Sequence, residues 1–243
     1  MPGRLRYGIL GGTFDPPHIG HLILAQEAYV RLGLDRVWFI PTGVSPHKLG
    51  QPVTPAIHRV AMLERALLSD TRFAWLTLEI ERPGPSYTVD TLRELRTQWG
   101  PEVEIALILG WDMLLYLPQW REPEAVVASV DQIAAVHRPG AGPDTRLDGV
   151  VARLPDLRAK LRMIPFPQLD ISGAAIRERV AQGLPIRYLV SNVVSGYISA
   201  QGLYSRDGGD SEIAGGVAQG SSGHSSEHST REAQREAEQE AQR

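Results

Sequence analysis

The sequence of 243 residues contains no cysteine. It therefore offers no disulfide framework, no thiolate ligand for a metal and no cysteine nucleophile. No apolar run approaches the roughly 18 residues that suggest a membrane-spanning helix, and no stretch is typical of a secretory signal. We therefore expect a cytoplasmic protein with no membrane partner, whose chemistry depends on His, Lys, Arg and Asp.

The charges are spread unevenly along the chain. The formal net charge is −3, and from Asp207 onward eight acidic residues and three arginines contribute −5, which leaves +2 for residues 1–206. A mildly basic body suits a protein that handles small anions, and it argues against a nucleic-acid partner.

Residues 206–243 form an acidic segment that is rich in Ser, Gly, Glu and Gln and has almost no large apolar side chain. Such a segment buries too little apolar surface to offset the entropy of ordering it, so we expect a disordered tail. Residues 229–243 also fit a charged helix, although an isolated helix of this length is marginal in water. The remaining residues 1–205 are long enough for one domain with a sizeable core.

Short apolar runs alternate with helical patterns in this domain, and no internal repeat is present. Strands are expected over residues 7–10, 37–40, 74–78, 103–109 and 132–136, with a weaker candidate over 161–164. Helices are expected over residues 18–32, 57–68, 88–99 and 173–182. The alternation predicts a single α/β domain: a Rossmann-like, doubly wound parallel sheet with helices on both faces. Ligands of such sheets bind beyond the carboxyl ends of the strands.

The most informative stretch is Gly11-Gly12-Thr13-Phe14-Asp15-Pro16-Pro17-His18-Ile19-Gly20-His21, which follows the first expected strand. Gly11 and Gly12 permit the positive φ values and the close backbone approach that a phosphate-binding turn requires. The next helix should begin near Pro17 and end near Gly33. A strand, a glycine turn and a helix start together predict an anion site.

His18 and His21 lie three positions apart in the first turn of this helix and therefore share a face. Two imidazoles beside free backbone N–H groups can hold one phosphoryl group as negative charge builds on it. Taken alone, a glycine pair is common, and two histidines at this spacing also fit half of a metal site or a solvated helix end. The combination of both features within residues 11–21 favours the phosphate site.

Residues 11–21, called the HxGH segment below, resemble the signature of the HxGH nucleotidyltransferases, which are related to the class I aminoacyl-tRNA synthetases. The resemblance implies an enzyme that uses ATP and transfers a nucleotidyl group while pyrophosphate leaves. The residues that it implies for the ATP phosphates are Gly11, Gly12, Thr13, Phe14, His18 and His21.

A second segment, residues 169–179, contains an unusual helix start. Ser172 is the expected N-cap, no acidic residue occupies the first turn, and Arg177 places a cation near the positive end of the helix dipole. A bound polyphosphate would neutralise this arrangement. From the local sequence alone, an ion pair of Arg177 with Glu178 or Asp170 fits equally well.

This segment resembles the ISSTxIR signature of the same superfamily, which binds the β- and γ-phosphates of ATP. The resemblance implies that Ile171, Ser172 and Arg177 complete the triphosphate site. Gly173 and Ala174 replace the second serine and the threonine of the signature. Because two hydroxyl donors are missing, we expect weaker binding of ATP.

Three further segments indicate the acceptor: Ser45 to Lys48 in a loop after the second strand, Ser86 to Leu92 at a helix start, and Leu109 to Trp120. Together with residues 11–21 they resemble the bacterial nicotinate-nucleotide adenylyltransferases, and the resemblance covers about residues 6–204. It implies that the enzyme joins the AMP part of ATP to nicotinate mononucleotide, which gives deamido-NAD and pyrophosphate in NAD biosynthesis.

The same resemblance implies roles for individual residues. Gly110 and Asp112 contact nucleotide ribose, and Lys48 contacts a phosphate. Tyr87 and Thr88 bind the nicotinate carboxylate, and Trp120 stacks on the pyridine ring. Without the resemblance, Asp112 also fits a helix cap and Trp120 a packed surface aromatic. Because backbone N–H donors favour a carboxylate over a carboxamide, we expect the deamido substrate to be preferred. Three other tryptophans are assigned to packing: Trp38, Trp75 and Trp99.

No side chain is placed as a covalent nucleophile, so the expected reaction is in-line attack of the acceptor phosphate on the α-phosphorus of ATP. Mg²⁺ would be held mainly by phosphate oxygens and water, with no protein ligand set. Other adenylyl- and cytidylyltransferases, including phosphopantetheine adenylyltransferase, share the Gly-Thr-Phe-Asp start but lack the segment at residues 86–92 and Trp120. A nucleotide-binding sensor without turnover stays open because of Gly173 and Ala174. The oligomeric state also stays open.

Overall fold

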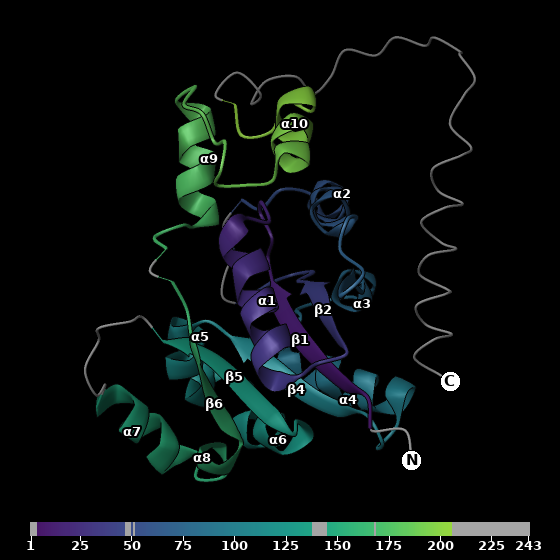
Figure 1. Cartoon of the computed structure of the whole chain (residues 1–243), viewed down its shortest axis with the longest axis vertical. Helices are drawn as coiled ribbons and strands as arrows, with labels where there is room; N and C mark the ends of the chain where they lie inside the picture. Colours follow the sequence, from purple (N-terminus) through teal and green to yellow (C-terminus); the bar gives the residue numbers. More distant parts are fainter. Residues whose placement is uncertain (1–3, 47–49, 51, 138–144, 168, 206–243) are drawn as a thin grey trace.

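The computed structural model describes residues 4–46, 50, 52–137, 145–167 and 169–205 (Figure 1). Two expectations fall outside the described residues: the phosphate contact of Lys48, and the disordered tail over residues 206–243. None of the helices in the described ranges is both long enough and apolar enough to cross a membrane.

A single sheet of six strands forms the centre of the molecule, in the order β3-β2-β1-β4-β5-β6, and every neighbouring pair is parallel. The strands are β1 (Arg6–Gly12), β2 (Arg36–Pro41), β3 (Phe73–Trp75), β4 (Glu104–Leu109), β5 (Gln132–His137) and β6 (Leu161–Pro165). The doubly wound sheet is confirmed, and so is its sixth strand. The order reverses between β1 and β4, which is where ligands of such sheets bind.

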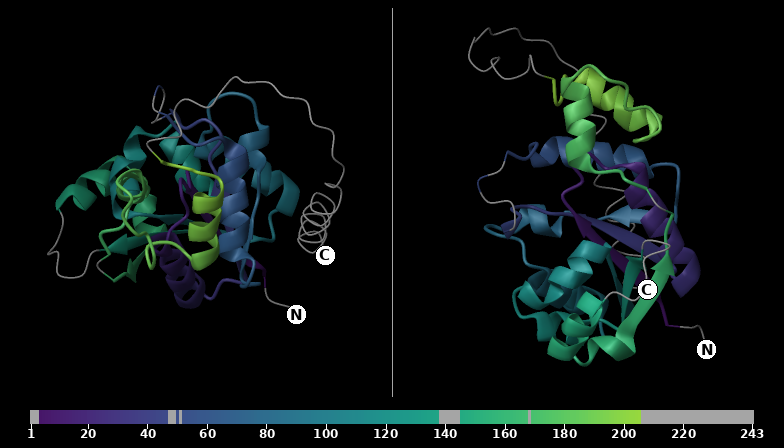
Figure 2. Two further views of the ribbon diagram at one scale, coloured as in Figure 1. Left: turned by 90° about the horizontal axis from the view of Figure 1, so that it is seen from above. Right: turned by 90° about the vertical axis from the view of Figure 1, so that its left-hand side faces the viewer.

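Helices cover both faces of the sheet (Figures 1 and 2), so its central strands are apolar on both sides. In β2, Val37 and Phe39 belong to one core cluster, whereas Trp38 and Ile40 belong to the other. Trp38 also packs against Tyr7, with ring centroids 5.9 Å apart. The two buried clusters cover the two faces of the sheet. A ligand site is therefore expected beyond the carboxyl ends of the strands.

The described helices are α1 (Ile19–Leu32), α2 (Ala56–Leu67), α3 (Leu78–Glu81), α4 (Thr88–Trp99), α5 (Trp111–Tyr116), α6 (Pro123–Ser129), α7 (Thr145–Arg153), α8 (Leu157–Lys160), α9 (Gly173–Ala181) and α10 (Asn192–Ala200), with a 3-10 helix η2 (Leu117–Gln119). The four expected helices are α1, α2, α4 and α9, each within one residue of its expected ends. The expected strand over residues 74–78 is wrong at its end. After Leu76 bonds to Phe39, the chain turns, and Leu78 begins α3.

A third apolar cluster joins α2 to α9 and α10 beyond the carboxyl end of β1 (Figure 1). Its members include Met62 of α2, Ile176 of α9 and Val194 of α10, each with no exposed surface. Next to it, the N–H of Ile19 donates to the carbonyl of Leu189 at 2.9 Å. The last described part of the chain therefore covers the start of α1.

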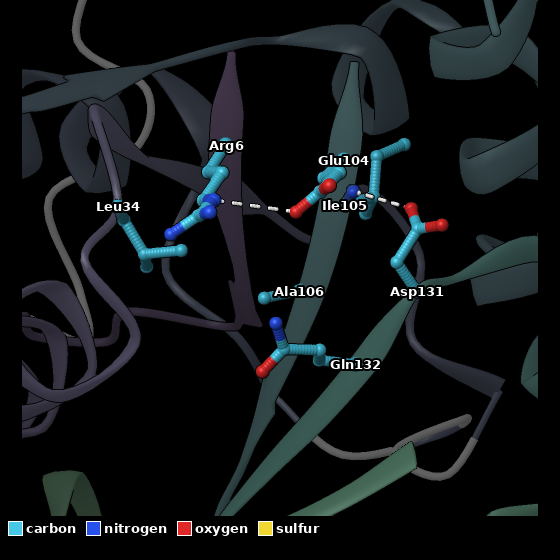
Figure 3. A pocket seen from close by; sticks show the side chains of 7 residues that line it. All are labelled: Arg6, Leu34, Glu104, Ile105, Ala106, Asp131 and Gln132. Carbon is cyan, nitrogen blue, oxygen red and sulfur yellow. Dashed lines mark hydrogen bonds and ion pairs between the residues drawn. The ribbon is translucent and has the colours of Figure 1, made fainter. Parts of the chain in front are cut away.

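A small hollow lies at the opposite edge of the sheet, beside the amino ends of β1, β4 and β5 (Figure 3). Its charged side chains have partners of their own. Arg6 forms an ion pair of 3.3 Å with Glu104, and Asp131 accepts a hydrogen bond of 2.8 Å from the N–H of Ile105. We therefore assign this hollow to packing and look for the site at the carboxyl edge.

Candidate active site

Two imidazole rings are stacked at the start of α1. His18 is the N-cap of the helix, and its ring centroid lies 3.7 Å from that of His21, with 24° between the planes. The main-chain N–H of His18 donates to Nδ1 of His21 at 3.1 Å. In a neutral His21, this bond places the ring proton on Nε2.

His18 is the more buried of the two, with 9% of its surface exposed. Burial lowers the pKa of His18 to about 4. Its Nδ1 atom is buried and has no hydrogen-bond partner among the residues that the structure describes. His18 is therefore neutral at pH 7, and a hydrogen bond from its ring would carry no positive charge.

The turn after β1 differs from the expectation. Gly11 and Gly12 still belong to β1, where Gly12 pairs with Pro41, and neither has a positive φ. The positive φ, 50°, belongs to Phe14, whose buried ring lies edge-on to His21 with centroids 4.9 Å apart. The prediction of positive φ at the glycines is thus wrong. Open space remains at Gly11, where an added Cβ would have no neighbour within 4 Å.

Asp15 joins the HxGH segment to three distant parts of the chain. It is 6% exposed, and its Oδ1 accepts a hydrogen bond of 2.7 Å from the hydroxyl of Tyr204. Its Oδ2 accepts one of 3.2 Å from the N–H of Thr54. Arg177 donates from Nη1 to the main-chain oxygen of Asp15 at 2.6 Å, and the same Nη1 lies 3.8 Å from Oδ2.

The start of α9 therefore lies directly against the HxGH segment. Ser172 is the N-cap, as expected, and its Oγ accepts a hydrogen bond of 3.2 Å from the N–H of Ala175. A Cβ at Gly173 would lie 2.7 Å from the main-chain oxygen of Asp15, whereas Ala174 is exposed. The two departures from the ISSTxIR signature thus have different surroundings, because only position 173 has no room for a side chain.

Arg59 of α2 connects the ends of β1 and β2, which sequence reasoning missed. It is 2% exposed and donates three hydrogen bonds of 2.9 Å to the main-chain oxygens of Thr13, Thr42 and Thr54. Burial lowers the pKa of Arg59, while the nearby carboxylate of Asp15 opposes that shift. The guanidinium therefore fixes the loops that flank the HxGH segment.

Ser86 connects the end of β2 to the start of α4. Its Oγ accepts a hydrogen bond of 3.1 Å from the N–H of Gly43 and donates one of 3.4 Å to the main-chain oxygen of Glu79. Tyr87 is the N-cap of α4 and Thr88 is its first residue, so the free N–H groups expected there are present.

Trp120 ends the helix η2 and packs, half-buried, against the core. Its Nε1 is buried and lacks a hydrogen-bond partner within the described part of the chain. The guanidinium of Arg121 lies 4.7 Å from the ring centroid of Tyr87 and 3.7 Å from Asp90. These contacts hold the loop with Trp120 against the start of α4, so the structure brings three of the acceptor residues into one region.

Gly110 and Asp112 lie after β4, the neighbour of β1 on the other side of the switch in strand order. Gly110 is the N-cap of α5, and Asp112 is an exposed residue in the first turn of that helix. Asp112 is therefore not the helix cap that the local sequence also allowed. It lies at the same edge of the sheet as the HxGH segment.

Comparison with known proteins identifies relatives over most of the chain. The cytidylyltransferase-like family matches residues 9–179. A probable nicotinate-nucleotide adenylyltransferase of Thermomicrobium roseum is 44% identical over 199 residues, which are 82% of this chain and 91% of the relative. One of a Roseiflexus species is 48% identical over 197 residues, 81% of this chain and 96% of the relative.

Solved structures share the fold at lower sequence identity. The nicotinic acid mononucleotide adenylyltransferase of Plasmodium falciparum, complexed with APC, has a TM-score of 0.66 and 19% identity, and the match covers 82% of this chain and 97% of that one. The same enzyme complexed with NaAD has a TM-score of 0.65.

Proposed function

Because this chain belongs to the cytidylyltransferase-like family and, within it, to the nicotinate-nucleotide adenylyltransferases, we propose that it transfers the adenylyl group of ATP to nicotinate mononucleotide. The products are deamido-NAD and pyrophosphate. This is a step of NAD biosynthesis, and both substrates are small molecules.

One observation carries the assignment of the site: Arg177 of α9 contacts Asp15 at 2.6 Å, and Asp15 belongs to the HxGH segment that also carries the stacked rings of His18 and His21. This contact joins the start of α9 to the segment that leads from β1 into α1. Such an arrangement suits one triphosphate, because the free N–H groups of helix starts and a guanidinium all favour negative charge.

In the proposed reaction, a phosphate oxygen of nicotinate mononucleotide attacks the α-phosphorus of ATP. The new P–O bond forms as the bond from the α-phosphorus to the bridging oxygen of the pyrophosphate breaks, and that oxygen keeps the electron pair. His21 donates a hydrogen bond from Nε2 to the phosphoryl oxygens, and Arg177 neutralises the leaving group. His18 remains neutral and contacts the ATP phosphates together with His21. Gly11, Gly12, Thr13, Phe14, Ile171 and Ser172 line the ATP phosphates, while Gly110 and Asp112 contact ribose.

The acceptor would lie toward α4. The N–H groups at Tyr87 and Thr88 bind the nicotinate carboxylate, Trp120 stacks on the pyridine ring, and Lys48 contacts a phosphate. The bond between Ser86 and Gly43 supports this side of the proposal, because it fixes the start of α4 against the loop after β2. Hydrogen bonds to an ionised acceptor are roughly twice as strong as neutral ones, so the carboxylate should be preferred to the amide.

Mg²⁺ is the proposed cofactor, held by the phosphate oxygens of ATP and by water. The donor set fits this arrangement. Among the described residues no group of three His, Asp or Glu side chains could hold a metal ion, and both carboxylate oxygens of Asp15 already accept hydrogen bonds. When bound, the ion would neutralise part of the charge on the leaving pyrophosphate.

The test is a product assay with equal concentrations of MgATP and of either nicotinate mononucleotide or its amide. We expect one deamido-NAD for each pyrophosphate released, and a kcat/KM for the acid at least about tenfold above that for the amide. Reactions with CTP in place of ATP, and with phosphopantetheine as acceptor, serve as controls. ATP binding without release of pyrophosphate for any acceptor would instead indicate a sensor.

A further inference from the structure

We propose that Tyr204 is a positioning residue for ATP: its hydroxyl, through Asp15, sets the place of the Arg177 guanidinium in the triphosphate site. The inference rests on the proposed function in one respect, since it takes Arg177 to contact ATP. It adds a residue at the far end of the domain, 189 positions from Asp15 in the sequence.

The geometry makes Tyr204 a fixed donor. Its hydroxyl donates to Oδ1 of Asp15 at 2.7 Å and lies 3.9 Å from the sulfur of Met62. Its backbone has a φ of 66°, which is unusual for a residue with a side chain and is retained when the surroundings hold it there. Burial and the bond to Asp15 raise the pKa of Tyr204, so the hydroxyl keeps its proton at neutral pH.

Among the residues that the structure describes, the carboxylate of Asp15 accepts one hydrogen bond at each oxygen, from Tyr204 on Oδ1 and from Thr54 on Oδ2. Arg177 is engaged mainly by the main-chain oxygen at 2.6 Å and lies farther, 3.8 Å, from Oδ2. The hydroxyl of Tyr204 therefore holds Oδ1, and Oδ2 is the carboxylate oxygen that faces Arg177, at 3.8 Å from its Nη1. Without the Tyr204 hydroxyl, Oδ1 of Asp15 loses its hydrogen bond although it is nearly buried. The carboxylate then turns toward the guanidinium of Arg177 and draws it away from the phosphates.

Tyr197 is the matched control. It lies on α10, in the same final part of the domain, and its hydroxyl bonds to Nδ1 of His58 at 2.9 Å, while its ring lies under the guanidinium of Arg65 at 4.5 Å. The Tyr197→Phe variant thus removes one hydroxyl that fastens the same segment to α2 but has no bond to Asp15. An effect specific to Tyr204 separates positioning of Arg177 from general attachment of the segment.

The experiment compares Tyr204→Phe, Tyr197→Phe and the unaltered chain. Calorimetry gives the Kd of α,β-methylene-ATP with Mg²⁺, and steady-state assays give KM for ATP and for nicotinate mononucleotide. We expect Tyr204→Phe to raise the Kd and the KM for ATP about fivefold to tenfold, as for one lost hydrogen bond, and to leave KM for the acceptor within about twofold. Tyr197→Phe should leave all three within about twofold.

A double-mutant cycle with Arg177→Gln tests the route of the effect. If Tyr204 acts through Arg177, adding Tyr204→Phe to Arg177→Gln leaves the Kd unchanged, because the group being positioned is already gone. An unchanged Kd in Tyr204→Phe alone, an equal rise in Tyr197→Phe, or independent effects in the double variant would each overturn the inference. Binding of the analogue needs no acceptor, so an unaltered chain that binds it without forming deamido-NAD contradicts the proposed function alone.

Discussion

Arg177 donates a hydrogen bond of 2.6 Å to the main-chain oxygen of Asp15, although 162 positions separate the two residues in the sequence. This bond places the start of α9 against the segment that carries the two stacked histidines. The parts of the chain that resemble two separate phosphate-binding signatures thus form one candidate site. The following predictions concern the contribution of its individual residues to stability and to turnover.

The burial of His18 should make the protein less stable in acid. Between its ordinary pKa of 6.5 and its folded pKa of about 4, the unfolded chain binds more protons than the folded one. His18 therefore does not reduce the free energy of unfolding above pH 6.5. Its effect grows as the pH is lowered and reaches a loss of about 2.5 kcal/mol at pH 4.5. Urea unfolding at several pH values measures it.

The control for this prediction is His18→Asn, which keeps a favoured N-cap residue and removes the titrating group. Carboxyl groups titrate in both proteins, so the difference between the two pH curves isolates the imidazole. Parallel curves for the variant and the unaltered chain would show that folding does not lower the pKa of His18.

Replacing His21 by alanine should reduce turnover much more than stability. Loss of one donor to the charge that develops in the transition state costs about 100- to 1000-fold in kcat, whereas the lost bond to the N–H of His18 costs about 1 kcal/mol of unfolding free energy. Gln26→Ala, at an exposed position of the same helix, is the control. Near-normal turnover in His21→Ala would exclude the imidazole from the reaction.

The two departures at the start of α9 should respond in opposite ways. Ala174→Thr adds a hydroxyl at an exposed position and should lower KM for ATP. Gly173→Ser forces a Cβ to within 2.7 Å of the main-chain oxygen of Asp15 and should lower the melting temperature and raise KM for ATP. Steady-state kinetics and thermal unfolding of both variants check the pair, and a KM for ATP in Ala174→Thr that is unchanged or higher contradicts the first half.

Arg59→Lys should destabilise the fold although the charge is kept. A single ammonium does not reproduce the fork that holds three carbonyl oxygens, and carbonyls left without partners in the interior cost about 2–4 kcal/mol in unfolding free energy. Arg158→Lys, at an exposed position on α8, should change it by less than about 0.5 kcal/mol. Equal values for the two variants in urea unfolding would remove Arg59 from its proposed place in the framework.

The local sequence pattern was sufficient to predict the long helices and the strands of the sheet, but it did not predict the helices of four residues. The alternation of strands and helices predicted the parallel sheet because both faces are buried, as the two clusters around β2 confirm. Helices such as α3 and α8 have four residues each and offer no periodicity to detect. The turn after β1 was mispredicted because Gly12 continues the pairing with β2, and the strained φ falls on Phe14 instead.

The residues that join distant segments at the site could not be predicted from the sequence. Arg59 left a faint signal, since it shares the buried face of α2 with Met62 and Leu63. Asp15 lies inside the recognised segment, but its partners come from three distant places. Tyr204 left no local signal, because its one decisive contact spans 189 positions. Spacing predicts which residues share a helix face, whereas contacts between distant segments follow only from the fold.

The most direct measurement is a crystal structure of the chain with Mg²⁺ and α,β-methylene-ATP. The account predicts that Nε2 of His21 and the guanidinium of Arg177 each lie within about 3 Å of oxygens of the same triphosphate, with the hydroxyl of Tyr204 still on Asp15. A triphosphate bound elsewhere at the edge of the sheet, or one that contacts only one of these two side chains, would contradict it.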